Sequence, residues 1–186
     1  MAIELVECSR MFYELERERA ELIAELGEWP SGRLGFRPVA GAWSAVEVLD
    51  HVVRAEAGTI EDVRAGLRNP HALGDERRPG IAALDRALRS DQSFKVPAGA
   101  EMIFPDAQSS LAEVAGRWEA ARADLRGVLE GLGSEDVRCG VFHHPFAGWM
   151  TVGDVLNHFS GHLYHHQFQL ERLRISSVDL QVMDVR

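Results

Sequence analysis

Four of the chain's eight histidines lie in the stretch His158-Phe159-Ser160-Gly161-His162-Leu163-Tyr164-His165-His166-Gln167-Phe168-Gln169. The stretch follows Thr151-Val152-Gly153-Asp154, which has the pattern of a capping box. In a capping box the first and fourth side chains each bond the backbone N–H of the other residue. A helix is therefore predicted to begin at Thr151 and to carry all four histidines.

The histidines of this helix are predicted to lie on two faces. At about 100° per residue, His166 falls inside an apolar stripe and His162 lies at its edge. The stripe consists of Val152, Val155, Leu156, Phe159, Leu163, Leu170 and Leu173. On the same count His158, His165 and Gln169 lie on the flank next to His162, and His166 is expected to point away from them.

His162 and His166 are four residues apart, so their rings lie about one helical turn apart and suit a shared transition-metal ion. Imidazole is the commonest metal-ligand side chain. The alternative is structural, because a histidine on an apolar face is commonly a hydrogen-bonded core residue. Two ligands do not hold a metal tightly, so metal binding requires a third ligand from elsewhere in the chain.

The composition describes a globular protein of one domain. The chain has 186 residues, 46% of them hydrophobic and 26% charged, which is ordinary for a globular domain with a sizeable core. Its formal charge is −9, and Lys95 is its single lysine. Nucleic-acid binding depends on clustered Lys and Arg, so no nucleic-acid partner is expected.

Neither a membrane segment nor an export signal is predicted. The chain has no run of about 18 apolar residues, and its first residues lack a basic region followed by an apolar one. We therefore expect a cytoplasmic protein without a membrane partner. Cys8 and Cys139 form no metal-type pair and are too few for a disulfide framework, so they are expected to be reduced.

Three further long helices are predicted. The first runs from Ile3 to about Glu28, with apolar residues at helical spacing, and ends at the Trp29-Pro30-Ser31-Gly32 turn. A capping box at Ser44 begins the second, which reaches about Leu67.

The third helix is predicted to begin at Ser109 or Ser110 and to end at Gly133. The four helices together indicate an all-α fold, a four-helix bundle. We expect its core to include Leu49, Val52, Trp118, Leu125, Leu156, Phe159 and Leu163.

The connection from Asn69 to Gln108, between the second and third helices, is long for one domain. It contains Gly74, Pro79, Gly80, Pro97, Gly99 and Pro105, and a short helix is predicted from about Ile81 to Leu88. Such a crossover allows the second and third helices to run parallel, so simple up-down-up-down order is not required.

Two segments flank the last helix. The aromatic-rich segment 141–150 leads into Thr151 and is interpreted either as a pocket wall or as a loop packed against the bundle. After Leu173, apolar and polar residues alternate in a strand-like pattern. This divides the chain into a bundle domain, residues 1–174, and a C-terminal tail, residues 175–186, which is either an arm on a second subunit or a loose end.

His51 is the histidine of the second helix, and periodicity alone does not decide its role. Val48 and Ala55 widen the apolar stripe on one side, and His51 lies just beyond them. This position fits a side chain that points into a cleft at one end of the bundle, and it fits a half-exposed surface histidine equally well.

Three features together resemble the DinB-like (DinB/YfiT) superfamily over Ala42 to Leu170. They are Trp43-Ser44 opening a helix with His51 in its second turn, the segment His143-His144-Pro145-Phe146-Ala147-Gly148-Trp149-Met150-Thr151, and the spacing His162-x-x-His165-His166-x-x-Gln169. The resemblance implies a four-helix bundle with a long crossover between its second and third helices. It also implies a divalent metal, often zinc or nickel, held by His51, His162 and His166. Relatives include thiol-dependent enzymes, namely S-transferases that use bacillithiol or mycothiol and a maleylpyruvate isomerase.

Three functional hypotheses follow. The first is an enzyme whose three-histidine metal keeps an open position and activates water or a low-molecular-weight thiol, giving thiol transfer to, or hydrolysis of, a small-molecule substrate. The chain has no HExxH motif, so any general base must come from elsewhere, with His158 or His165 as candidates. The second is a non-catalytic, metal-stabilised stress or ligand sensor that acts as a homodimer. The third is a bundle without metal.

Overall fold

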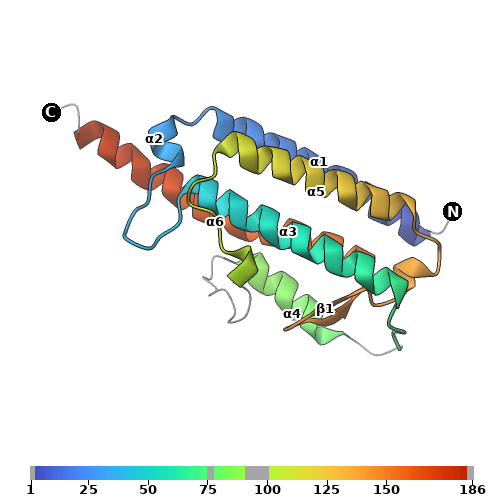
Figure 1. Ribbon diagram of the computed structural model, residues 1–186. Helices are drawn as coiled ribbons and strands as arrows, with labels where there is room; N and C mark the ends of the chain where they lie inside the picture. Colours follow the sequence, from blue (N-terminus) through green and yellow to red (C-terminus); the bar gives the residue numbers. More distant parts are fainter. Residues whose placement is uncertain (1–2, 75–77, 91–100, 184–186) are drawn as a thin grey trace.

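Four long helices form a bundle in the computed structural model, which describes residues 3–74, 78–90 and 101–183, with side chains up to Ser177. They are α1 (Ile3–Gly27), α3 (Ala45–Arg68), α5 (Leu111–Glu130) and α6 (Val152–Met183). Helices α1 and α6 run in one direction, and α3 and α5 run in the other (Figure 1). The predicted all-α bundle, with a long crossover between two parallel helices, is confirmed. No described helix is long and apolar enough to cross a membrane.

Capping boxes begin three of the four helices; the sequence predicted those at Ser44 and Thr151, and the structure adds the one at Ser110. They pair Ser44 with Glu47, Ser110 with Glu113, and Thr151 with Asp154. At α6, the Asp154 carboxylate accepts the Thr151 N–H at 2.8 Å, and the Thr151 hydroxyl accepts the Asp154 N–H at 3.2 Å. The end of α5 differs from the prediction, because its C-cap is Gly131 and not Gly133.

The core lies along the length of the bundle, and every residue expected there is at most 1% exposed. Within it, two charged residues face each other. The Arg122 guanidinium donates two hydrogen bonds of 2.8 Å to the Glu56 carboxylate, and Trp118 Nε1 donates a third of 2.8 Å. Burial of a carboxylate is costly unless it is paired, and here Glu56 is fully satisfied.

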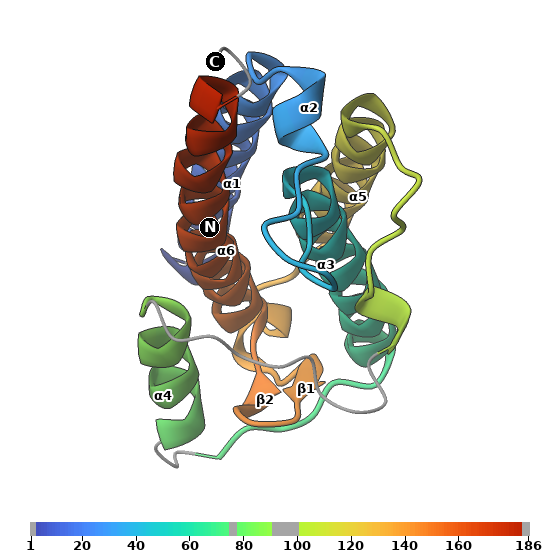
Figure 2. The ribbon, with the colours of Figure 1, turned by 90° about the vertical axis from the view of Figure 1, so that its left-hand side faces the viewer.

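Shorter helical elements lie in the connections between the long helices. They are α2 (Ser31–Leu34), α4 (Pro79–Leu88), and the 3₁₀ helices η1 (Glu101–Ile103) and η2 (Asp136–Arg138). Helix α4 confirms the short helix predicted within the crossover and packs beside α6 (Figure 2). Part of the crossover, including Lys95, Pro97 and Gly99, lies outside the described residues.

The aromatic-rich segment before α6, interpreted from the sequence as a pocket wall or as a loop packed against the bundle, forms a β-hairpin. Strands β1 (Phe142–His144) and β2 (Gly148–Met150) pair antiparallel, and Gly148 has a φ of +75°, which favours glycine at the turn. Val141, Ala147 and Met150 are buried in the core. These contacts support the interpretation of the segment as packed against the bundle.

The prediction of a strand-like tail is wrong, because α6 continues to Met183. The alternation after Leu173 has no partner strand to satisfy its backbone, whereas extending an existing helix adds one hydrogen bond per residue. The last turns of α6 extend beyond α2 (Figure 1). Residues 184–186 lie outside the described part.

Candidate metal centre

His51, His162 and His166 converge between α3 and α6. One ring nitrogen from each lies within 4.8 Å of those from the other two. His162 Nε2 and His166 Nε2 lie 3.1 Å apart, and the His51 ring centroid lies 5.2 Å from that of His162 and 4.9 Å from that of His166. The structure therefore brings together the three histidines that the resemblance indicated.

The spacing of these nitrogens fits a zinc-like ion. Imidazole nitrogens bind zinc at about 2.0–2.1 Å, so two ligands of a tetrahedral site lie about 3.4 Å apart. The observed separations, from 3.1 Å to at most 4.8 Å, span this value. Small ring rotations would complete the geometry, and three ligands leave at least one coordination position for water or substrate.

His51 is held in a defined orientation by the crossover. It is 4% exposed, and its Nδ1–H donates to the backbone carbonyl of Ile103, in η1, at 2.9 Å. Its Nε2 is therefore the nitrogen left with a free lone pair. The Trp43 ring lies against it, with centroids 4.9 Å apart. The sequence allowed either an inward-pointing or a half-exposed His51, and the structure shows that the side chain is buried.

His166 is oriented in the same way by a residue of its own helix. Its Nδ1–H donates to Gln169 Oε1 at 3.0 Å, which leaves Nε2 to face His162. The expectation that His166 points away from Gln169 is therefore wrong, because residues three apart on a helix are close enough for a long side chain to reach back. Hydrogen bonds of this kind to the second ring nitrogen fix the tautomer of histidines that bind metals.

Burial keeps the histidines of the centre uncharged. It lowers the pKa of His51, lowers that of His162 well below its usual value, and lowers that of His166 to about 3, and the neighbouring histidines lower each pKa further. Neutral imidazole is the form that binds metals. The cluster is therefore in its ligand form at neutral pH.

The other two histidines of α6 lie next to the cluster and do not join it. The His158 ring stacks 5.9 Å from His162 and lies 5.1 Å from His144 of the hairpin, and burial lowers the pKa of His158 to about 4. His165 borders His166, with ring centroids 5.1 Å apart. Among the described residues, the group able to share one ion contains neither His158 nor His165.

Sequence reasoning missed two parts of the site. One is the Ile103 carbonyl, which no side-chain pattern reveals. The other is Asp50, which precedes His51 and whose side chain is 0% exposed. Although burial opposes its ionisation, the N–H of Asp106 and the guanidinium groups of Arg54 and Arg117 hold the pKa of Asp50 below its usual value. Asp50 could have been found from the sequence, because an acidic residue inside the apolar run Val48 to Val53 indicates a buried and compensated carboxylate.

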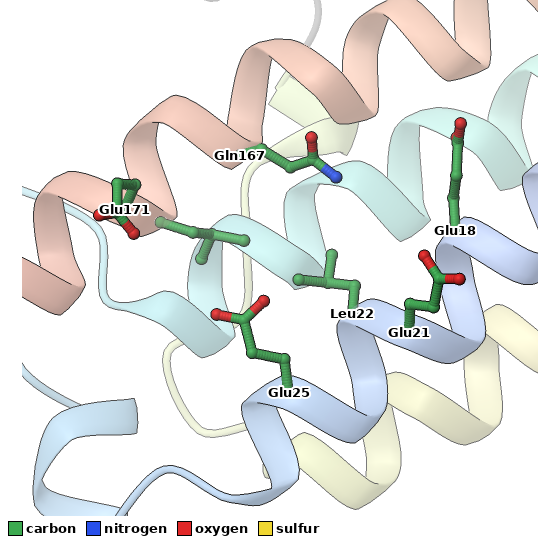
Figure 3. A pocket seen from close by; sticks show the side chains of 7 residues that line it. Glu18, Glu21, Leu22, Glu25, Gln167 and Glu171 are labelled. Atoms are coloured by element: carbon green, nitrogen blue, oxygen red, sulfur yellow. The ribbon is translucent and has the colours of Figure 1, made fainter.

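A separate hollow of about 300 Å³ lies between α1 and α6. Figure 3 shows the carboxylates of Glu18, Glu21, Glu25 and Glu171 around it. None of the three clustered histidines lines this hollow. Its acidic lining is therefore distinct from the candidate metal centre.

Fold and site define a class, that of helical bundles with a three-histidine cluster able to hold a divalent metal. Comparison with protein families matches the model of the DinB superfamily over residues 14–170, and the chain belongs to that superfamily. No curated protein and no solved structure matches the chain.

Proposed function

We propose that the protein is a metal-dependent enzyme that acts on a small molecule through a divalent transition metal, zinc or nickel, held by His51, His162 and His166. The observation that carries the proposal is the convergence of three uncharged imidazoles, two of which have Nδ1 bound to a protein acceptor and Nε2 directed into the cluster. A histidine that served only as core packing would not need this common orientation.

The reaction we propose is thiol transfer or hydrolysis, in line with thiol-dependent enzymes of the superfamily. A divalent metal with three histidine ligands lowers the pKa of a bound water or thiol, and so supplies a nucleophile at neutral pH. The chain itself keeps the surroundings apolar. Trp43 packs on His51, and Phe104 packs on Trp43 with ring centroids 6.3 Å apart, so aromatic rings cover His51 on that side of the cluster.

Of the two candidate general bases, His158 is poorly suited to the role. A base works best when its pKa lies near the working pH, whereas burial lowers the pKa of His158 to about 4. Burial also lowers the pKa of His165, which lies at the edge of the cluster and is less deeply enclosed. If the reaction needs a side-chain base, His165 is the better candidate.

The second candidate function is a non-catalytic, metal-stabilised module that senses stress or a ligand as a homodimer. Burial of the cluster favours it, since His51 is 4% and His166 is 5% exposed. A metal held so deeply would stabilise the bundle by linking α3 to α6, whereas a substrate would have to displace covering side chains.

Metal analysis followed by a thiol screen tests the proposal. The purified protein should contain about one equivalent of zinc or nickel, and His166→Ala should abolish this stoichiometric metal. The matched control is His165→Ala, which removes a neighbouring imidazole outside the cluster and should retain the metal. The metal-loaded protein is then assayed with low-molecular-weight thiols and electrophilic or hydrolysable small molecules.

The outcomes separate the candidates. Metal binding with turnover that His166→Ala abolishes supports the enzyme. Stoichiometric metal that raises the melting temperature, without turnover of any substrate in the screen, favours the module. A wild-type protein that binds no divalent ion at neutral pH contradicts both proposals.

A further inference from the structure

Asp50 connects α3 to the segment that follows η1. Its carboxylate accepts the backbone N–H of Asp106 at 2.7 Å, the Arg54 guanidinium at 2.7 Å and the Arg117 guanidinium at 2.6 Å. Arg117 lies on α5 and also donates to the hydroxyl of Ser109 at 2.9 Å. One buried carboxylate thus joins two helices of the bundle to the end of the crossover.

The same segment orients His51. Ile103, whose carbonyl accepts the His51 Nδ1–H, lies three residues before Asp106, whose N–H binds Asp50. Adjacent residues of α3 therefore hold the crossover at two points, one through a carboxylate and one through an imidazole. Without the hydrogen bond between Asp50 and the Asp106 N–H, only the His51 ring and local packing would fix the position of the Ile103 carbonyl.

Neither helix capping nor a surface ion pair accounts for this buried carboxylate. The capping box at Ser44 already begins α3, and Asp50 lies in the second turn of the helix. A pair with Arg54 alone could form at the helix surface, where it would contribute little. Burying an acid completely costs free energy unless several donors compensate it, and the donors here are supplied by the crossover and α5.

We propose that Asp50 is a positioning residue for the metal centre. By fixing the segment from Ile103 to Asp106, it holds the carbonyl that keeps the His51 proton on Nδ1 and its Nε2 lone pair directed at His162 and His166. This inference rests on the proposed metal-binding function. Arg117 shares the role through its bond to the same carboxylate, although it contacts none of the three histidines.

Two measurements on four variants test the inference. The first is the tautomer of His51 in the metal-free protein, read from long-range ¹H–¹⁵N correlations of the imidazole. The second is the dissociation constant for Zn²⁺, measured by competition with a chelator. The variants are Asp50→Ala, Asp50→Asn, Arg117→Gln and the control Arg64→Gln. Arg64 also bridges α3 and α5, through Glu61 and Asp124, and lies outside the described contacts of the cluster.

Asp50→Ala should weaken Zn²⁺ binding by about 10- to 100-fold, the usual effect of losing an outer-shell partner, and should give a mixture of His51 tautomers. Asp50→Asn retains a carbonyl oxygen for the Asp106 N–H and should restore most of the affinity. Arg117→Gln should weaken binding by a smaller factor, and Arg64→Gln should leave both the tautomer and the dissociation constant unchanged.

The inference is overturned if Asp50→Ala keeps the Nδ1–H tautomer and a wild-type dissociation constant. It is also overturned if Asp50→Asn binds Zn²⁺ as weakly as Asp50→Ala. The negative charge of Asp50, and not its hold on the segment from Ile103 to Asp106, would then determine the Zn²⁺ affinity. If the wild-type protein binds no Zn²⁺, the proposed function fails. The tautomer comparison still decides whether Asp50 positions His51.

Discussion

Mild acid should strongly destabilise the metal-free protein, because its buried histidines must then gain protons. Burial lowers the pKa of His158 to about 4 and that of His166 to about 3, whereas an unfolded histidine has a pKa of about 6.5. Between these values the unfolded chain binds more protons than the folded chain. The free energy of unfolding therefore falls as the pH drops below about 6.5, and the loss ends only below the folded-state pKa values.

The size of the effect follows from the two pKa values. At about pH 5 both histidines are largely protonated in the unfolded chain and neutral in the folded chain. A gap of about 1.5 pH units at about 1.36 kcal/mol per unit gives about 2 kcal/mol for each, or about 4 kcal/mol together. The lowered pKa values of His51 and His162 add to this loss. Carboxylates contribute little above pH 5, since their unfolded pKa values are near 4.

Urea unfolding of chelator-treated protein, followed by circular dichroism at about pH 7.5 and about pH 5, measures this difference. His158→Gln should reduce the loss by about 2 kcal/mol, whereas the control His143→Gln, which alters an exposed ring, should not change it. Equal free energies of unfolding at the two pH values would refute the reasoning, because the histidines would then not be held neutral by the fold.

Three other predictions concern the bundle. Glu56→Ala should lower the free energy of unfolding by about 3–5 kcal/mol, since it removes the buried carboxylate that pairs with the 1% exposed side chain of Arg122; a loss under about 1 kcal/mol in urea unfolding would contradict this. Gly66→Ala should destabilise the fold, because the new Cβ would lie 1.8 Å from the backbone oxygen of Val141, whereas Gly127→Ala meets nothing within 4 Å and should not lower the melting temperature. Deleting residues 175–186 should leave the bundle folded and weaken any dimer, as sedimentation and circular dichroism can check; an unfolded product would show that these residues are part of the bundle.

Local sequence signals predicted where the helices begin and which residues fill the core. A capping box such as that of Ser44 and Glu47 is formed within one turn, so its pattern can be read without knowledge of the rest of the fold. The stripe of α6 likewise placed His162 and His166 on adjacent positions of one face. The tail was misread because alternation over a few residues is weak when a long helix precedes it.

The parts of the site that sequence did not reveal depend on contacts between distant segments. Periodicity placed His51 on a flank of its helix, but η1, more than fifty residues later, lies against that flank, and its Ile103 carbonyl accepts a hydrogen bond from the His51 Nδ1–H. The hydrogen bond between His166 and Gln169 depends on the rotamers of the two side chains, which helical periodicity does not determine. The position of Asp50 inside an apolar run indicates burial, but its hydrogen-bond donors come from α3, α5 and the crossover, and the sequence alone does not bring these together.

The arrangement of the helices also sets an order of events during synthesis. Helix α3 is made early, yet the partners of His51 lie more than a hundred positions further along the chain, on α6. Closing this loop costs conformational entropy, which the packing of α6 against the other helices offsets. A ribosome-bound chain that stops before α6 would therefore hold one histidine of the cluster and no chelating site. Under the proposed function, metal uptake follows the synthesis of α6, and metal-loaded molecules are those in which α6 has already packed against α3.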